Sequence, residues 1–165
     1  MATEEQTVDT GLASIRGAFD FRLGQRLTIS NRVVSKLSFK LHKSNGDSGN
    51  ITYTIRRVSN DALLASKVWG DAATLSTNSD GAWCEATLDS PVLVNEEVRI
   101  QAEYVGDQVL YHIATTSVKA NELKTSYNGV YSDRVDWDTC YIYTYTEPAV
   151  GGGGGPGSLV AAGVI

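Results

Sequence analysis

Short stretches of alternating apolar and polar residues run from Ala18 to Thr146, separated by Gly, Asn, Asp and Ser. The clearest is residues 33–42, in which most apolar side chains fall on one face and two lysines and a histidine on the other. A period of two residues is typical of a half-buried antiparallel strand. The turn-rich segment 43–50 then leads to a second alternating stretch, 51–58, so the pair predicts a hairpin.

The same pattern predicts further strands along the middle of the chain, and no long helical pattern competes with them. About nine short strands at this spacing favour an all-β fold, specifically an antiparallel two-sheet β-sandwich that is jelly-roll-like. An immunoglobulin-like topology stays open, because spacing does not determine strand order. The predicted strands are residues 18–23, 26–30, 33–42, 51–58, 62–69, 82–88, 97–105, 108–114 and 139–146.

The two chain ends differ from this middle, which we expect to form one β-sandwich domain over residues 18–148. Residues 1–17 are polar and predict an N-terminal arm. Residues 149–165 contain a run of glycines, which predicts a flexible tether carrying an apolar C-terminal peptide. That peptide is a candidate for docking on a neighbouring subunit, and a frayed terminus is the alternative. Its candidate partner-binding residues are Leu159, Val160, Val164 and Ile165.

Composition narrows the classes of function. Hydrophobic residues at 42% and charged residues at 20% are ordinary for a soluble globular protein. A net charge of −5 provides no positive field for phosphates, so we expect no nucleic-acid partner. The apolar C-terminal peptide is far shorter than the roughly 20 residues that span a bilayer, so we expect no membrane span. The acidic, polar start lacks the features of a signal peptide, which predicts synthesis in the cytoplasm.

The residues that carry most enzyme chemistry are scarce. Cys84 and Cys140 are too few for a disulfide framework and fit small buried side chains, although their pairing stays open. His42 and His112 lie on alternating strands, and no nucleophile or phosphate-binding motif accompanies them. We therefore expect no catalytic residues and no enzyme activity. Carboxylate pairs for glycoside hydrolysis stay open as an alternative, because such pairs meet only in space.

Several segments resemble a β-sandwich domain of phage tail and other virion structural proteins, which in secreted proteins is similar to carbohydrate-binding modules. The resemblance covers residues 18–146. The family often has a glycine where Glu97 stands, and the glycine tail has no counterpart in it. The resemblance implies a sandwich with a role in either virion structure or glycan recognition. Four segments carry the resemblance: an opening strand within residues 29–41; a small loop and a strand at 49–55; an aromatic-led strand, a Pro-Val-Leu turn and another strand over 83–100; and the ending at 127–145.

The last predicted strand places Tyr141, Tyr143 and Tyr145 on one face, with smaller residues on the other. If the smaller residues face the core, the tyrosines form an outward ladder suited to subunit contacts. The alternative places the tyrosines in the core or in a stabilising cross-strand row.

Aromatic residues near loops are candidates for glycan binding, because an aromatic face suits the apolar face of a sugar ring. These candidates are Trp69, Trp137 and Tyr131, with core or rim packing as the alternative. Trp83 belongs to the same group of tryptophans but lies further from a predicted loop.

Three neighbouring carboxylates, Asp133, Asp136 and Asp138, are the ligand type that calcium prefers. Their spacing lacks the glycine and distal glutamate of an EF-hand loop, so a solvated acidic loop is the alternative. No other cofactor is expected.

Together these features favour a non-enzymatic structural or assembly protein of a virion or filamentous appendage, such as a capsid decoration, tail or fibre component. We expect homo-oligomeric contacts, further contacts with other subunits of the assembly, and a location in the virion or an extracellular assembly. The alternative function is a carbohydrate-binding module that recognises glycans through loop aromatics.

Overall fold

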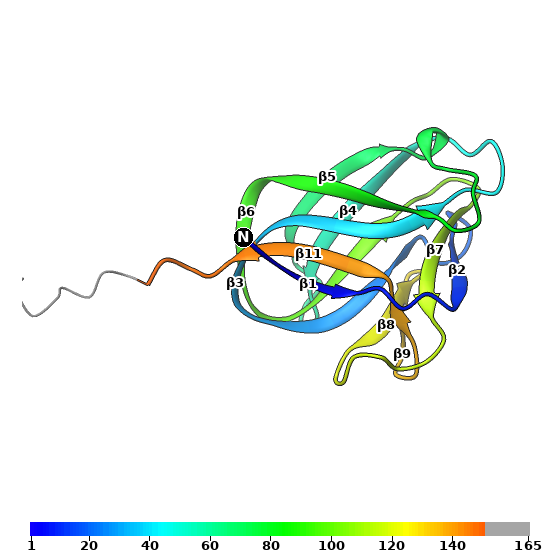
Figure 1. The fold of residues 1–165 in the computed structure, drawn as a ribbon. Coiled ribbons are helices and arrows are strands. Elements are labelled where there is room, and N and C mark those ends of the chain that lie inside the picture. Colours follow the sequence, from blue (N-terminus) through cyan, green and yellow to red (C-terminus); the bar gives the residue numbers. More distant parts are fainter. Residues whose placement is uncertain (151–165) are drawn as a thin grey trace, which may run out of the picture.

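The computed structural model describes residues 1–150, which form an all-β body of long, twisted strands (Figure 1). Every strand pair is antiparallel, which confirms the predicted fold class. The elements are β1 (Ala2–Gln6), β2 (Gly11–Ile15), β3 (Arg22–His42), β4 (Asn50–Arg57), β5 (Leu63–Asp71), the 3₁₀ turn η1 (Ala72–Thr74), β6 (Ala82–Glu103), β7 (Val109–Ala114), β8 (Leu123–Tyr127), β9 (Tyr131–Arg134), β10 (Asp138–Thr139) and β11 (Tyr141–Thr146). No helix in this part of the chain is long and apolar enough to cross a membrane.

Hydrogen bonding joins these strands into one continuous sheet of eleven strands, two more than the sequence predicts. Its main path runs β1-β11-β3-β6-β4-β5, so β1 and β5 end this path. Strand β7 pairs with β2, β10 and β3, and β8 pairs with β3 and β9. The two separate sheets expected for a sandwich are therefore not shown.

The sheet is continuous because β3 and β6 are 21 and 22 residues long and pair along most of their length. Three predicted strands overlap β3, and two overlap β6. Irregularities in the register between Ile29 and Arg32 bend the pair without ending it. At this bend Asn31 has a positive φ of 52°, and its N–H donates to Asn95 Oδ1. Residues that resemble a turn in the sequence thus form a bulge inside one strand.

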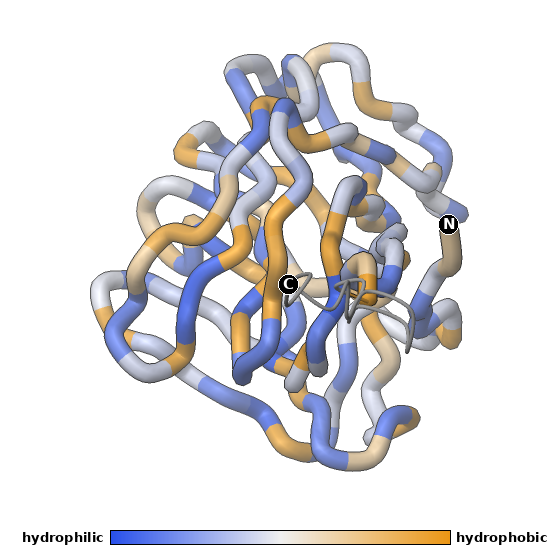
Figure 2. The backbone as a smooth tube through the Cα atoms, turned by 90° about the vertical axis from the view of Figure 1, so that its left-hand side faces the viewer, coloured by the Kyte–Doolittle hydropathy of each residue, from blue (hydrophilic) through white to orange (hydrophobic). Residues whose placement is uncertain are grey.

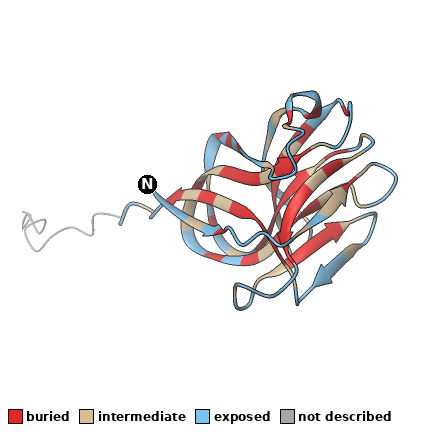
Figure 3. Ribbon diagram, turned by 45° about the vertical axis from the view of Figure 1, so that its right-hand side comes forward, coloured by how far each residue is buried: buried red, intermediate tan, exposed pale blue. Residues whose placement is uncertain are grey.

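The core lies where the bent sheet folds back on itself, and Figure 3 shows buried residues along most of the strands around it. Phe39 of β3 meets Tyr53 of β4 edge-to-face, with 4.6 Å between ring centroids, and Tyr111 of β7 at 5.4 Å. The Tyr53 hydroxyl donates to the carbonyl of Cys84 on β6. Apolar and polar positions alternate along the strands in Figure 2, as expected when one face of each strand is buried.

The first 17 residues, expected to form an arm, contain two strands of the sheet. Strand β1 pairs with β11 so that Ala2 lies opposite Tyr145, and β2 pairs with β7. Strand β1 was not recognised because its residues are mostly polar, which is possible in an edge strand that buries few side chains. The hairpin of β8 and β9 was also not recognised, because its residues are mostly polar even though Lys124, Thr125 and Ser126 of β8 are buried. One consequence is that the N-terminus belongs to the body of the protein.

Candidate functional sites

The tyrosines of β11 face the core, so the predicted outward ladder is wrong. Tyr141, Tyr143 and Tyr145 are 0%, 1% and 9% exposed. The strand is covered on this face because Arg32 lies over the Tyr145 ring at 4.0 Å and donates to the Tyr143 hydroxyl. The Tyr141 hydroxyl donates to Glu122 at 2.6 Å. The smaller residues between the tyrosines take the opposite face of the strand. The other predicted partner-binding residues, Leu159, Val160, Val164 and Ile165, lie outside the described residues.

The predicted glycan-binding aromatics do not form an open stacking surface. Trp137 is partly buried, and the Arg134 guanidinium lies 4.0 Å from its ring centroid. Tyr131 is covered by Arg99 at 3.7 Å, and its hydroxyl is hydrogen-bonded to acidic and basic side chains of the chain itself. Trp69 packs against the core. The guanidinium groups of Arg134 and Arg99 therefore already stack on the rings of Trp137 and Tyr131.

The three aspartates predicted as calcium ligands serve separate contacts. Asp133 forms ion pairs with Arg26 and Arg99 and accepts from Thr125. Asp136 lies near Arg134 on the surface. Asp138 is fully buried; it accepts from the Gln25 amide at 2.6 Å and from the backbone N–H groups of residues 118 and 119. Within residues 1–150 no three His, Cys, Asp or Glu side chains gather as metal ligands. The predicted calcium site is therefore not formed.

The structure brings together a polar site that the sequence did not predict. His42 Nδ1 and His112 Nε2 are 2.8 Å apart, and His112 Nδ1 is 2.7 Å from Asp9 Oδ2. The same carboxylate oxygen accepts from Lys40 Nζ at 2.8 Å. Both histidines are buried, at 4% and 2% exposure. A pocket of about 300 Å³ opens beside them, lined by Asp9, Gly11, Leu12, Lys40, Ser79, Asp80 and His112.

Four parts of the chain position this histidine pocket. Lys40 and His42 are two residues apart on β3, His112 lies on β7, and Asp9 lies between β1 and β2. The turn before β6 closes over the imidazole, because Gly81 has a φ of +67° and a Cβ added there would lie 2.3 Å from His112 Nε2. Only a glycine fits this position without displacement.

The electrostatics of the pocket follow from burial and pairing. Burial, together with the neighbouring His112, lowers the pKa of His42. Burial alone would raise the pKa of Asp9, but hydrogen bonds from Lys40 and His112 outweigh it and hold that pKa below its usual range. Within residues 1–150, no hydroxyl or thiol is hydrogen-bonded to either imidazole. This part of the chain therefore shows an acid–imidazole chain without a positioned nucleophile.

An exposed tryptophan stands beside this pocket. Trp83 on β6 lies directly opposite Lys40 in the register with β3, so both side chains project from the same face. Trp83 is 38% exposed. The strand alternation of the sequence was consistent with this outward direction, but nothing in it joined Trp83 to Asp9, 74 residues earlier.

The two cysteines are free and buried. Burial raises the pKa of Cys84 to about 11 and that of Cys140 to about 12, so neither thiol ionises near neutral pH. No family model matches the chain, and no curated protein matches it either. Function is therefore inferred from the geometry of the chain itself.

Proposed function

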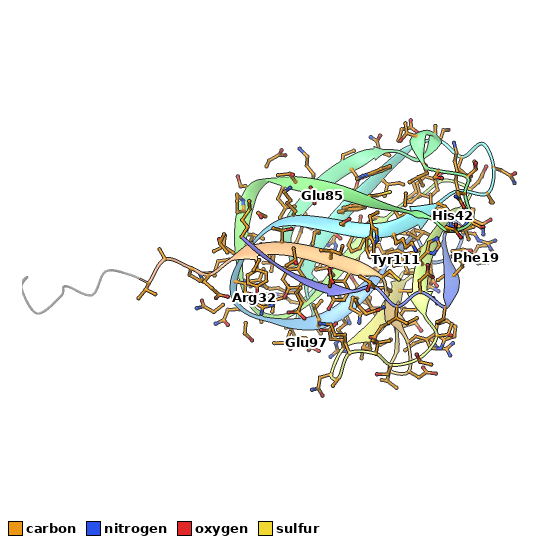
Figure 4. The ribbon with its side chains drawn as sticks, viewed as in Figure 1. Phe19, Arg32, His42, Glu85, Glu97 and Tyr111 are labelled. Atoms are coloured by element: carbon orange, nitrogen blue, oxygen red, sulfur yellow. The ribbon has the colours of Figure 1, made fainter. Side chains whose placement is uncertain are left out.

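We propose that the chain is a non-enzymatic structural or assembly protein of a virion or filamentous appendage, such as a capsid decoration, tail or fibre component. The observation that supports this is the position of the chain ends. Ala2 pairs with Tyr145, so the N-terminus and the exit toward residues 149–165 lie side by side at one end of the body (Figure 1). His42 and Phe19 lie at the opposite end (Figure 4). Attachment through the C-terminal segment leaves that end free.

The two strands that end the main path of the sheet, β1 and β5, favour contact through the C-terminal segment over direct strand pairing at these edges. Glu4 on β1 lies opposite Tyr143 and so points toward the inner face, where it pairs with Arg32 and Lys119. Lys67 on β5 lies opposite Tyr53 and pairs with an aspartate of β6. Inward-pointing charges on edge strands oppose edge-to-edge association.

The C-terminal segment supplies the contact in this proposal. Its glycines connect the body to the apolar residues from Leu159 to Ile165, and a neighbouring copy of the chain is the partner. Tethering raises the effective concentration of a second contact once a first has formed. A lattice of such contacts is cooperative without any large single interface. In this proposal the assembled protein belongs to the virion or an extracellular assembly.

The oligomeric state tests this proposal. Light scattering after size exclusion, together with electron microscopy, would compare the full chain with a chain ending at Pro148. A matched control keeps the length and replaces Leu159, Val160, Val164 and Ile165 with serine. We expect higher-order particles from the full chain and monomers from both variants. A full chain that stays monomeric at millimolar concentration contradicts the proposal, and particles that persist in both variants contradict the role of the segment.

A second candidate function, glycan binding, is favoured by the histidine pocket and Trp83. An exposed indole beside carboxylate, ammonium and hydroxyl groups matches the mixed apolar and polar faces of a sugar ring. A glycan array with the Trp83→Ala variant tests it, and Trp137→Ala is the control because Arg134 already covers that ring. Binding that is lost only in Trp83→Ala supports this candidate. The absence of binding, or equal loss in both variants, argues against it.

A further inference from the structure

A buried carboxylate oxygen without a partner lies at the end of the body opposite the termini. Asp47, in the connection between β3 and β4, is 7% exposed. Its Oδ1 accepts the backbone N–H of Gln108 at 3.1 Å. Its Oδ2 is shielded from solvent and has no hydrogen-bond partner among residues 1–150. An unpartnered buried polar atom is costly, and a carboxylate oxygen especially so, which points to a ligand at this position.

The surroundings of Asp47 are acidic. Asp107, in the turn between β6 and β7, lines the same pocket. Neither carboxylate takes part in an ion pair with the residues that the structure describes. Burial raises the pKa of the neighbouring Tyr104 hydroxyl, and the charges of Asp47, Asp107 and Asp71 raise it further. Negative charge therefore gathers around Tyr104; Lys43 acts on Asp71, while Asp47 and Asp107 have no ion-pair partner among residues 1–150.

The pocket offers oxygen ligands of several kinds. It has a volume of about 280 Å³ and is lined by Ser44, Asn45, Gly46, Asp47, Asp107 and Gln108. Calcium binds carboxylates together with amide oxygens, hydroxyls, backbone carbonyls and water, in flexible geometry. Magnesium requires a near-ideal octahedron, which two irregular loops do not readily supply.

We propose that Asp47 and Asp107 hold a calcium ion in this pocket. Asn45 and Gln108 supply neutral oxygens, and water completes the shell. With only two carboxylates, the dissociation constant falls on the order of 10⁻⁴ to 10⁻³ M, as in extracellular calcium modules. The ion clamps the loop after β3 to the turn after β6. The site is separate from the residues predicted in the sequence and does not depend on the proposed function.

Calorimetric titration and thermal unfolding of the full chain, after treatment with a chelator, test the site. Calcium at about tenfold its dissociation constant is expected to raise the unfolding midpoint by about 3–6 °C. Magnesium at the same concentration is expected to produce a smaller shift. No calcium binding at millimolar concentration, with an unchanged midpoint, overturns the proposal and leaves a buried water as the partner of Oδ2.

Two variants and a control locate the binding. Asp47→Asn keeps the oxygen that accepts from Gln108 but removes the charge, so it should abolish the calcium shift while unfolding no earlier than the wild type in chelator. Asp107→Asn changes an exposed residue and removes one of the two charged ligands, so it should weaken calcium binding by at least about tenfold. Asp136→Asn should bind as the wild type does. Calcium binding that survives in both Asp47→Asn and Asp107→Asn overturns the assignment.

Discussion

The two buried imidazoles share one hydrogen bond, and the contact with Asp9 determines which ring nitrogen donates in it. Asp9 is a carboxylate, so His112 Nδ1 must donate to it. When both rings are neutral, His112 Nε2 then accepts from His42 Nδ1. A proton added to His42 Nε2 would leave this hydrogen bond in place, but burial and the neighbouring His112 disfavour the charged ring.

The free energy of unfolding should fall as the solution is acidified. The pKa of His42 is lowered in the folded state, so the unfolded chain binds more protons once the pH drops below about 6.5. The stabilisation is complete above that pH and is lost as the pH falls toward the lowered pKa. The lowered pKa of Asp9 adds a further loss at more acidic pH. Chemical denaturation across pH 8 to 5 measures this slope, which is at most about 1.4 kcal/mol per pH unit for one proton.

The matched variant is His42→Asn, whose amide nitrogen occupies the place of Nδ1 and does not titrate. We expect the variant to be less stable at pH 8 but to show a flatter dependence between pH 7 and 5. An unchanged slope would mean that the imidazole of His42 is not the group responsible.

Asp138 carries a second prediction at this scale. Its oxygens accept three hydrogen bonds, from the Gln25 side chain and the N–H groups of Val118 and Lys119. Asp138→Ala leaves these three donors without their hydrogen-bond partner. It should lower the free energy of unfolding by about 2–5 kcal/mol. Asp136→Ala, at an exposed position, should change the free energy of unfolding by no more than about 0.5 kcal/mol. Urea denaturation in chelator compares them, and equal losses would contradict the structural role of Asp138.

Among the elements, the pairing of β3 with β6 depends on close backbone approach at Gly24. A Cβ added there would lie 1.9 Å from the carbonyl oxygen of Ile100. Gly24→Ala should therefore displace the paired strand and lower the free energy of unfolding by about 1–3 kcal/mol. Gly70→Ala, on β5 with open space around it, is the control and should be neutral or slightly stabilising. Denaturant midpoints distinguish the two, and a tolerated Gly24→Ala would mean that β3 and β6 pair less closely here.

The elements also show what an alternating pattern predicts and what it cannot. The alternation correctly placed Leu37, Phe39 and Leu41 on the buried face of β3, because side-chain burial sets a period of two. It did not decide the direction of β11, because the tyrosines alternate there with Ile142 and Thr144, and neither set is clearly the polar one; the structure buries the tyrosines. The histidine pocket and the Asp47 pocket join residues about 60 to more than 100 positions apart, which local patterns do not connect.

For the whole molecule, the location of the N-terminus decides which chain end is available for contacts. Strand β1 covers the edge of β11, where Gln6 donates to the carbonyl of Thr139 and Glu4 pairs with Arg32 and Lys119. An arm that served only neighbouring subunits would make none of these contacts. The body therefore includes its N-terminal strand, which is why the proposed assembly assigns the subunit contact to the C-terminal segment.

Two deletions separate these roles. Removing residues 1–6 uncovers the edge of β11 and should cost about 2 kcal/mol or more, through lost hydrogen bonds and newly exposed parts of Tyr143 and Tyr145. Removing residues 149–165 keeps every strand pair described and should leave the urea midpoint unchanged while abolishing particles. If the chain without residues 1–6 were as stable as the full chain and failed only to assemble, the N-terminus would be a free arm. Both chain ends would then be candidates for the subunit contact, and the argument that assigns it to the C-terminal segment would fail.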